Sequence, residues 1–364
     1  MPAFLPGREL SRHFYVEAVL PLLDEYFSGL PHAAARIGWG SDVPGFDTEM
    51  SRDHDWGPSV HIFLRDRDAH LAEGIRETLS RHLSREFYGY PVNFAESAAE
   101  AGTVVMNTSG TGPVNHRVFP MTVRAFCSMQ LAYDIDLPPD AADWLTFPSQ
   151  ALLEVTSGAV HYDGVGELTA LRERLAWYPR DVWLYLLASG WQRIGQEGHL
   201  MQRAGCVGDE TGSAIIASRL ARDVMSLCFL MEKQYAPYPK WFGTAFQQLK
   251  CADQLLPVLW RAQQSPTWQE REAQLCDAYE MLARMHNALE ITEALPETVS
   301  PFFGRPFKVI HGEYFAQALV AQITDPAVKR IASRRLIGSI DQFSDNTDLR
   351  SVTDWRSTLR LLYL

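Results

Sequence analysis

The sequence predicts an α+β protein in which a mixed sheet with helices is followed by an all-helical C-terminal domain. Segments with strand character occur only before residue 165, whereas helical periodicity occurs in both halves. From Gly166 onward the chain shows no convincing alternating run. The turn Asp163-Gly-Val-Gly166 separates the two patterns, so we expect an α/β domain at 1–165 and a helical domain at 166–364.

The elements expected in the first half are helices and short strands in mixed order. Apolar residues at helical spacing predict an opening helix over 9–27 and a second helix over 68–86. Runs with strand character predict strands at 33–39 and 59–64, with a polar loop between them. Further short extended pieces are expected near 90–94, 102–106 and 117–123.

The second half contains long stretches of helical period at 167–177, 181–196, 210–235, 240–264 and 268–289. Several large aromatic residues fall in the first two of these stretches: Trp177, Trp183, Tyr185 and Trp191. Their spacing favours packing in a helical core over a box that stacks a nucleobase.

Charge and cysteine usage limit the partners and the compartment. The 364 residues include 33 Lys and Arg against 44 Asp and Glu, a net charge of −11, which argues against bulk nucleic acid as a partner. The five cysteines form no CxxC pair and are expected to be reduced thiols. With neither a signal-peptide pattern nor a long apolar window, we expect a cytoplasmic protein without a membrane partner.

The segment most informative for function is a Gly-Ser turn followed, after eleven residues, by an Asp-x-Asp pair. On an extended strand, Asp53 and Asp55 would point to the same face, and two adjacent carboxylates require a cation. Mg²⁺ is the natural one, because it combines one or two carboxylates with water and substrate phosphates. Gly40 and Ser41 would offer close backbone N–H groups and a hydroxyl to those phosphates.

This spacing resembles the nucleotidyltransferase superfamily with the DNA polymerase β type of palm, over residues 38–56. The order of a mixed half and a helical half is similar to the aminoglycoside and lincosamide nucleotidyltransferases. Within that group the chain resembles an uncharacterised bacterial family with a Gly-Ser-Asp turn and an Asp-His-Asp-Trp-Gly-Pro segment. The resemblance implies Mg²⁺-dependent transfer of an NMP, most simply AMP from ATP, to a hydroxyl of a small molecule, with pyrophosphate released. It assigns Mg²⁺ to Asp53 and Asp55 and phosphate to Gly40 and Ser41.

The sequence also departs from the superfamily pattern. His54 occupies a position that is usually apolar, and Gly57-Pro58 predicts a kink or bulge. The third carboxylate expected on a neighbouring strand is absent from 117–123. Substitutes are Glu96, Glu154 and Asp163, of which we take Glu154 as the catalytic candidate; each has an ordinary structural alternative.

Two other groups are candidates for the site. Lys240 stands near a predicted helix N-terminus and could neutralise nucleotide phosphates, or it could be a surface lysine. Asp42, Asp47 and Glu49 could steer a cationic acceptor such as an aminocyclitol, or they could be ordinary loop residues.

Two alternatives to a small-molecule nucleotidyltransferase remain. The missing third acid is compatible with a catalytically silent nucleotide-binding regulator. A nucleotidyltransferase acting on a protein or a tRNA end is the other alternative, although the charge balance does not favour a tRNA substrate.

Overall fold

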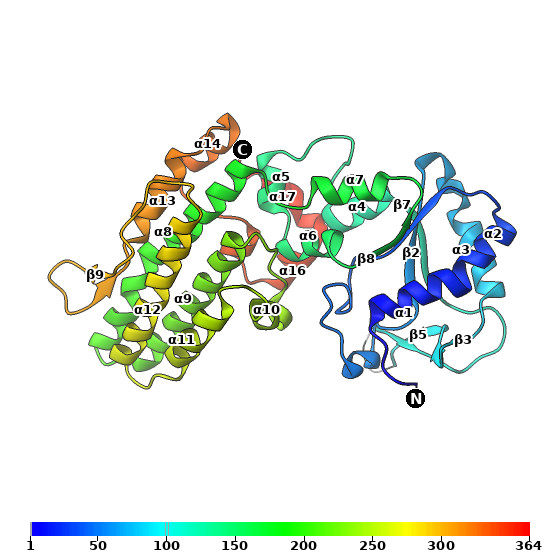
Figure 1. Cartoon of the computed structure of the whole chain (residues 1–364), viewed down its shortest axis with the longest axis horizontal. Coiled ribbons are helices and arrows are strands. Elements are labelled where there is room, and N and C mark those ends of the chain that lie inside the picture. Colours follow the sequence, from blue (N-terminus) through cyan, green and yellow to red (C-terminus); the bar gives the residue numbers. More distant parts are fainter. Residues whose placement is uncertain (1, 99, 101) are drawn as a thin grey trace. The chain divides into compact units, whose positions relative to one another are not determined.

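The computed structural model describes residues 2–98, 100 and 102–364, which form two compact units (Figure 1). The first unit comprises Met1–Pro138 and Ala151–Ala176, and the second comprises Pro139–Gln150 and Trp177–Leu364. The chain therefore enters the second unit twice. Residue 165, where the sequence changes pattern, falls inside the first unit.

A four-stranded mixed sheet organises the first unit, with strand order β7-β2-β1-β8. Its strands are β1 (His32–Arg36), β2 (Ser59–Leu64), β7 (Arg117–Thr122) and β8 (Ala159–Asp163). Strand β1 is antiparallel to β2 and to β8, whereas β2 and β7 are parallel. The strands expected at 33–39, 59–64 and 117–123 are confirmed. Strand β8 was not predicted, because this edge strand is only partly buried and has no continuous apolar run.

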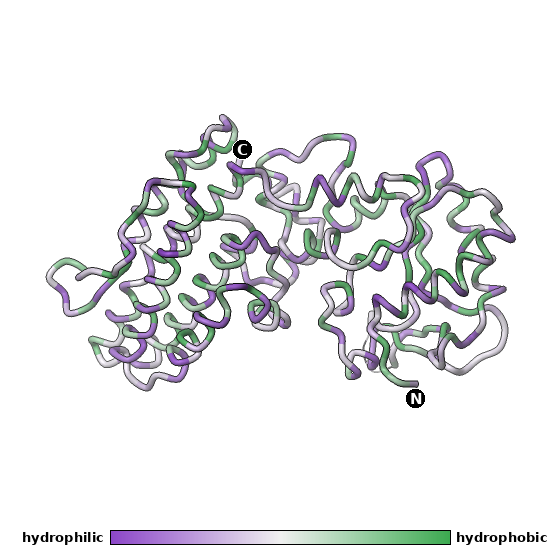
Figure 2. The backbone as a smooth tube through the Cα atoms, viewed as in Figure 1, coloured by the Kyte–Doolittle hydropathy of each residue, from purple (hydrophilic) through white to green (hydrophobic). Residues whose placement is uncertain are grey.

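Helices at the start of the chain cover one face of this sheet. Helices α1 (Gly7–Phe14) and α2 (Leu20–Tyr26) are joined by a π-helical turn, so the predicted helix over 9–27 is nearly continuous. Helix α3 (Ala72–His82) follows a 3₁₀-helix at Asp66–Leu71. These helices bury Phe14, Val19, Ile75 and Leu79 in one cluster with the strand residues Val60, Ile62 and Leu64. Figure 2 shows hydrophobic stretches along the strands at the centre of this unit.

The opposite face of β2 carries the alternate residues His61 and Phe63, which contact Phe126 of helix α4 (Val123–Leu131). Helices α6 (Ser149–Thr156) and α7 (Glu167–Arg174) lie before and after β8 in the chain. The remaining strands form two small hairpins: β3 (Glu86–Phe87) with β4 (Tyr90–Pro91), and β5 (Phe94–Glu96) with β6 (Val104–Met106).

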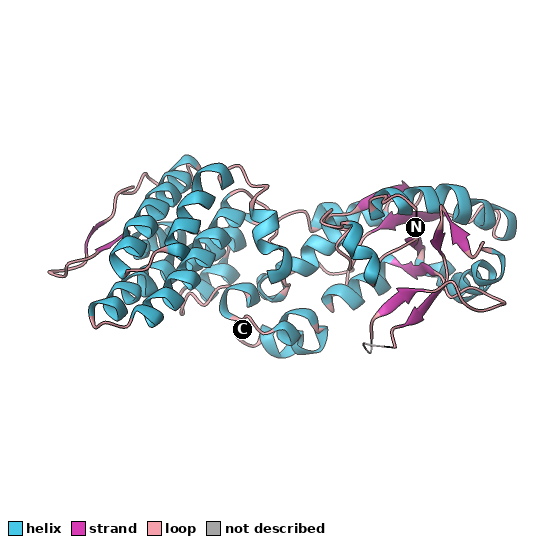
Figure 3. Cartoon of the chain, turned by 90° about the horizontal axis from the view of Figure 1, so that it is seen from below, coloured by secondary structure: helices cyan, strands magenta, loops and turns pink. Residues whose placement is uncertain are grey.

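The second unit is almost entirely helical (Figure 3). Its longer helices are α8 (Arg180–Cys206), α9 (Glu210–Met231), α11 (Ala252–Gln264), α12 (Trp268–Ala288) and α13 (Gly312–Ala321). Shorter helices are α5 (Ala141–Thr146), α10 (Pro239–Phe246), α14 (Pro326–Ala332), α15 (Ile340–Phe343), α16 (Thr347–Ser351) and α17 (Arg356–Arg360). One small ladder joins β9 (Ser300–Pro301) to β10 (Lys308–Val309).

Aromatic packing holds the helices of the second unit together. Trp191 of α8 stacks on Phe315 of α13 with ring centroids 4.1 Å apart. Trp183, Tyr185 and Trp191 are all buried. The expectation that they pack in a helical core is therefore confirmed for these three residues. Trp177 is half-buried and lies in the turn between α7 and α8.

The α+β class with a helical C-terminal part is confirmed. Helices α7, α8, α9 and α12 match predicted stretches, and the stretch over 240–264 divides into α10 and α11. Within the described residues, we find no helix with the length and apolar character needed to cross a membrane.

Candidate functional site

The Gly-Ser turn follows β1 at one edge of the sheet. Strand β1 ends at Arg36, and antiparallel pairing sets Ala35 opposite His61 near the start of β2. Parallel pairing sets Arg117, the first residue of β7, opposite Ser59, the first residue of β2. The end of β1 and the starts of β2 and β7 therefore meet at the same edge.

Glycine is required at position 40 of the turn. Gly40 has a φ of +123°, and a Cβ atom there would lie 2.4 Å from Nη2 of Arg36 and 2.5 Å from Oδ1 of Asp42. The hydroxyl of Ser41 donates to the Ser51 hydroxyl at 3.4 Å. The turn is thereby joined to the short helix that carries Asp53.

A buried ion pair fixes the inner side of this turn. Arg36 donates from Nε and Nη2 to the two carboxylate oxygens of Asp42, at 2.6 and 2.7 Å, and both residues are 3% exposed. Asp47 accepts hydrogen bonds from the Gly7 N–H at 2.7 Å and from the Trp56 indole at 3.0 Å. Asp42 is buried with both oxygens bound to Arg36, so its carboxylate is not available to steer a cationic substrate. Asp47 ties the loop to the rest of the unit through one carboxylate oxygen.

The expected position of the acid pair on a strand is wrong. Asp53 ends a 3₁₀-helix at Glu49–Asp53, and Asp55 has a left-handed backbone with φ of +48°. Strand β2 begins only at Ser59. Gly57, with φ of +140°, and Pro58 separate the acids from the strand, as the Gly-Pro kink suggested. The same-face rule for a strand therefore does not apply to these two carboxylates.

The two acids have different neighbours. Asp53 accepts the His54 backbone N–H at 2.9 Å and lies 2.9 Å from its Nδ1, with 61% of the Asp53 side chain exposed. The Asp55 carboxylate is 39% exposed and lies 3.6 Å from Nη1 of Arg117. Both carboxylates can therefore reach a ligand from solvent.

Buried polar atoms without partners lie at the same edge. Among the described residues, Nη1 of Arg117, Oγ of Ser59 and both ring nitrogens of His61 are buried and make no hydrogen bond. Burial lowers the pKa of Arg117, and the nearby Arg36 charge lowers it further. Burial, with the charges of Arg36 and Arg117, lowers the pKa of His61 to about 3, so its ring is neutral. Unpartnered buried groups call for an explanation, and a bound water or ligand is a common one.

This arginine is a site residue that the sequence analysis missed. Arg117 opens a strand that otherwise consists of uncharged residues, and a lone cation at a strand end was the signal that could have identified it. Its position opposite Ser59 and beside Asp55 results from strand pairing across distant parts of the chain.

The three proposed substitutes for the third acid lie in different places. The backbone carbonyl of Glu154 on α6 accepts the Gly38 N–H at 2.9 Å, which brings this residue to the turn. Glu96 is opposite Val104 in the β5–β6 hairpin, and the Val104 carbonyl accepts the Asp55 N–H at 2.8 Å. Asp163 instead accepts hydrogen bonds from Gly166 and Thr169 at the start of α7.

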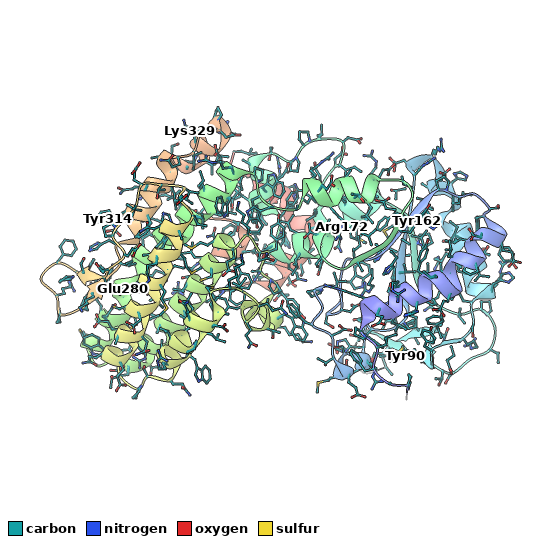
Figure 4. The ribbon with its side chains drawn as sticks, in the orientation of Figure 1. Tyr90, Tyr162, Arg172, Glu280, Tyr314 and Lys329 are labelled. Carbon is teal, nitrogen blue, oxygen red and sulfur yellow. The ribbon has the colours of Figure 1, made fainter. Side chains whose placement is uncertain are left out.

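Hydrogen bonds join the C-terminal end of helix α6 to α7 and to the loop that follows the Gly-Ser turn. Arg172 of α7, labelled in Figure 4, donates to the three carbonyls of residues 155–157 at 2.7 to 2.8 Å. The Gly158 N–H then donates to the Val43 carbonyl at 2.9 Å. Lys240, by contrast, belongs to the second unit, where it is exposed on α10 with its amine 5.1 Å from the Trp241 ring centroid.

The donor set fits a magnesium ion that shares its coordination with a substrate. Asp53 and Asp55 supply hard carboxylate oxygens, and Mg²⁺ commonly takes one or two of these beside waters and phosphate oxygens. Among the described residues, no three His, Cys, Asp or Glu side chains are grouped so that they could hold a metal ion.

Comparisons with known proteins give two similarities. Residues 144–242 match the profile of a domain of unknown function (DUF4037). No curated protein matches the chain. Among solved structures, the chain is similar to a nucleotidyltransferase-like protein from Exiguobacterium sibiricum 255-15, with 11% identity, a TM-score of 0.33, and coverage of 74% of this chain and 75% of that one.

Proposed function

We propose that the protein is a Mg²⁺-dependent nucleotidyltransferase that transfers an NMP, with ATP as the expected donor, to a hydroxyl of a small molecule. The observation that carries the proposal is the common edge at which β1 ends and β2 and β7 begin. The Gly-Ser turn lies there, with the Asp55 carboxylate 3.6 Å from the buried Arg117. The short helix that ends at Asp53 is joined to the turn by the bond from Ser41 to Ser51. These are the groups that a triphosphate and its cation require.

The proposed phosphate contacts come from the turn and from β7. Gly40 permits close approach of the backbone, and the Ser41 hydroxyl can exchange its long 3.4 Å bond to Ser51 for a phosphate oxygen. A phosphate oxygen would also give Nη1 of Arg117 the acceptor that the described residues do not provide. Without an anion, Nη1 of Arg117 lies 3.6 Å from the Asp55 carboxylate.

The metal would be held by Asp53 and Asp55. When bound, Mg²⁺ neutralises charge on the triphosphate and stabilises the negative charge that develops during transfer. The protein's own residues position the triphosphate and receive the acceptor's proton.

The reaction forms one bond and breaks one. The acceptor oxygen bonds to the α-phosphorus while the bond from that phosphorus to the bridging oxygen breaks, so pyrophosphate leaves with the bonding electrons. The hydroxyl proton passes to a general base. We propose Glu154 for this role, because its main chain is bonded to the turn.

A second candidate function is nucleotide binding without catalysis. It is favoured by β7, the neighbour of β2, which begins with Arg117 and contains no acidic residue. An arginine there can bind a phosphate but cannot act as a metal ligand or as a base at neutral pH.

Two measurements test these functions. Thermal shift with each NTP, with and without Mg²⁺, reports binding, and pyrophosphate release with a panel of hydroxylated acceptors that includes aminocyclitols reports transfer. We expect Asp53→Asn and Asp55→Asn to lose the Mg²⁺-dependent ATP shift while they remain folded, because both side chains are exposed. Glu49→Gln is the matched control, since its side chain is 75% exposed in the same loop.

The outcomes separate the candidates. An ATP shift with pyrophosphate release supports the transferase, and an ATP shift without release for any acceptor supports the binding protein. No shift with any NTP, or unchanged shifts in both Asn variants, would overturn the metal and phosphate assignment. Within the transferase, Glu154→Gln is expected to lower turnover while the ATP shift is retained.

A further inference from the structure

The helical unit contains a partly enclosed cavity of about 150 Å³. All of its lining residues belong to the second unit. They come from the start of α6, from α8 and the residue Tyr178 before it, from α9, from α10 and the segment that leads into it, and from residues 339–350. None of them belongs to the sheet edge where β1 ends and β2 and β7 begin.

The walls of this cavity are aromatic and closely packed. Tyr178 and Tyr235 meet edge to face, with ring centroids 5.2 Å apart. Phe229 contacts Phe242 at a centroid distance of 5.2 Å. Pro237 and Pro239 restrict the backbone that links α9 to α10. Because these side chains are already packed against one another, they can contact a flat ring with little loss of conformational entropy.

A nearly buried ion pair forms one polar side of the cavity. One carboxylate oxygen of Asp341 accepts hydrogen bonds from Nε and Nη2 of Arg350, at 3.0 and 2.8 Å. The other oxygen accepts a hydrogen bond from the Ser149 N–H at 2.7 Å. The Asp341 carboxylate is therefore engaged on both oxygens and is a poor partner for a ligand cation. This pair uses only two of the five N–H donors of Arg350.

A second arginine, Arg222, also lines the cavity. Arg222 is paired with Asp345, whose side chain is 71% exposed. Exposed ion pairs contribute little to stability, so Arg222 can exchange this partner at small cost. An anionic ligand can replace the exposed Asp345 on Arg222. A cationic ligand would meet Asp341, the acid among the lining residues, with both oxygens already engaged.

We infer that this cavity binds a monocyclic aromatic carboxylate, with the ring between the aromatic walls and the carboxylate on Arg222. A cavity of about 150 Å³ is the size that accepts a benzene ring. A carboxylate matches the fork of a guanidinium with two parallel hydrogen bonds. This binding site is separate from the proposed nucleotidyl transfer and does not depend on it.

The test compares three probes of similar size on the full chain. Benzoate, benzamide and benzylamine carry the same ring with a negative, a neutral and a positive substituent. By calorimetry or ligand-observed NMR we expect benzoate to bind in about the millimolar range, more tightly than benzamide and far more tightly than benzylamine. Equal binding of benzoate and benzylamine, or no binding of benzoate, would overturn the inference.

Two variants locate the ligand. Arg222→Gln is expected to weaken benzoate at least about fivefold and to leave benzamide unchanged, because only the carboxylate uses the charge. Ser226→Phe is expected to abolish binding of both, since Ser226 lines the cavity from α9 and a phenyl group would fill it. Ser226→Ala is its matched control and should bind like the natural protein.

Folding of each variant is checked by circular dichroism before binding is measured. Arg222 is 37% exposed, so Arg222→Gln should fold even if Ser226→Phe does not. Benzoate binding that is unaffected by Arg222→Gln would place the ligand elsewhere and refute the assignment.

Discussion

Removal of the Asp42 carboxylate charge is predicted to destabilise the first unit strongly. Asp42→Asn keeps the shape of the side chain but leaves Arg36 as a buried cation without a counter-charge. The two side chains are only 3% and 4% exposed, so water cannot replace the lost partner. Breaking a buried pair of this kind costs about 3–5 kcal/mol.

That free energy corresponds to a fall of about 6–20 °C in the melting temperature of the unit, at about 2–4 °C per kcal/mol. Scanning calorimetry measures it directly. Glu49→Gln is the control, because Glu49 pairs with Arg52 at the surface and its side chain is 75% exposed. Its expected change is within about 0.5 kcal/mol.

The double variant Arg36→Met with Asp42→Leu makes the test specific. Replacement of both charges by apolar side chains removes the uncompensated ion, so we expect most of the loss to be recovered. A change in Asp42→Asn no larger than that of Glu49→Gln would refute the buried-pair argument and would return Asp42 to the loop acids available to a substrate.

Three further predictions concern the turn, the buried histidine and the metal. Gly40→Ala should cost about 1–3 kcal/mol, because its Cβ would meet Arg36 and Asp42, whereas Gly74→Ala, in open space on α3, should not destabilise in the same calorimetric assay. His61 has a pKa lowered to about 3 from 6.5, so the folded state binds fewer protons and stability should rise with pH between these values. Urea titrations across that range give the slope of the free energy of unfolding against pH. His61→Phe should reduce this slope by up to about 1.4 kcal/mol per pH unit, and an unchanged slope would contradict the assignment. EDTA should abolish the ATP-induced thermal shift but leave the melting temperature of the free protein unchanged; a lower melting temperature would instead reveal a structural metal.

Local patterns in the sequence were sufficient to predict most of the elements. The apolar run at 59–64 is strand β2 at the predicted bounds, and the periodic stretches of the second half are helices. Propensity and periodicity act over neighbouring residues, so such elements can be read without the fold. Strand β8 was not predicted from the sequence, because an edge strand needs little apolar character.

A Gly-Ser turn and two acids in a polar loop between two strands can be recognised from the sequence alone. The groups that this loop presents depend on tertiary contacts. The prediction that Asp53 and Asp55 lie on a strand was wrong. Asp55 has a left-handed backbone, and strand β2 begins only after Gly57-Pro58, at Ser59. Pairing with Arg36 makes Asp42 structural, and pairing of β7 with β2 brings Arg117 to Asp55. Charge compensation in a buried site depends on contacts between distant segments, and no local pattern encodes those contacts.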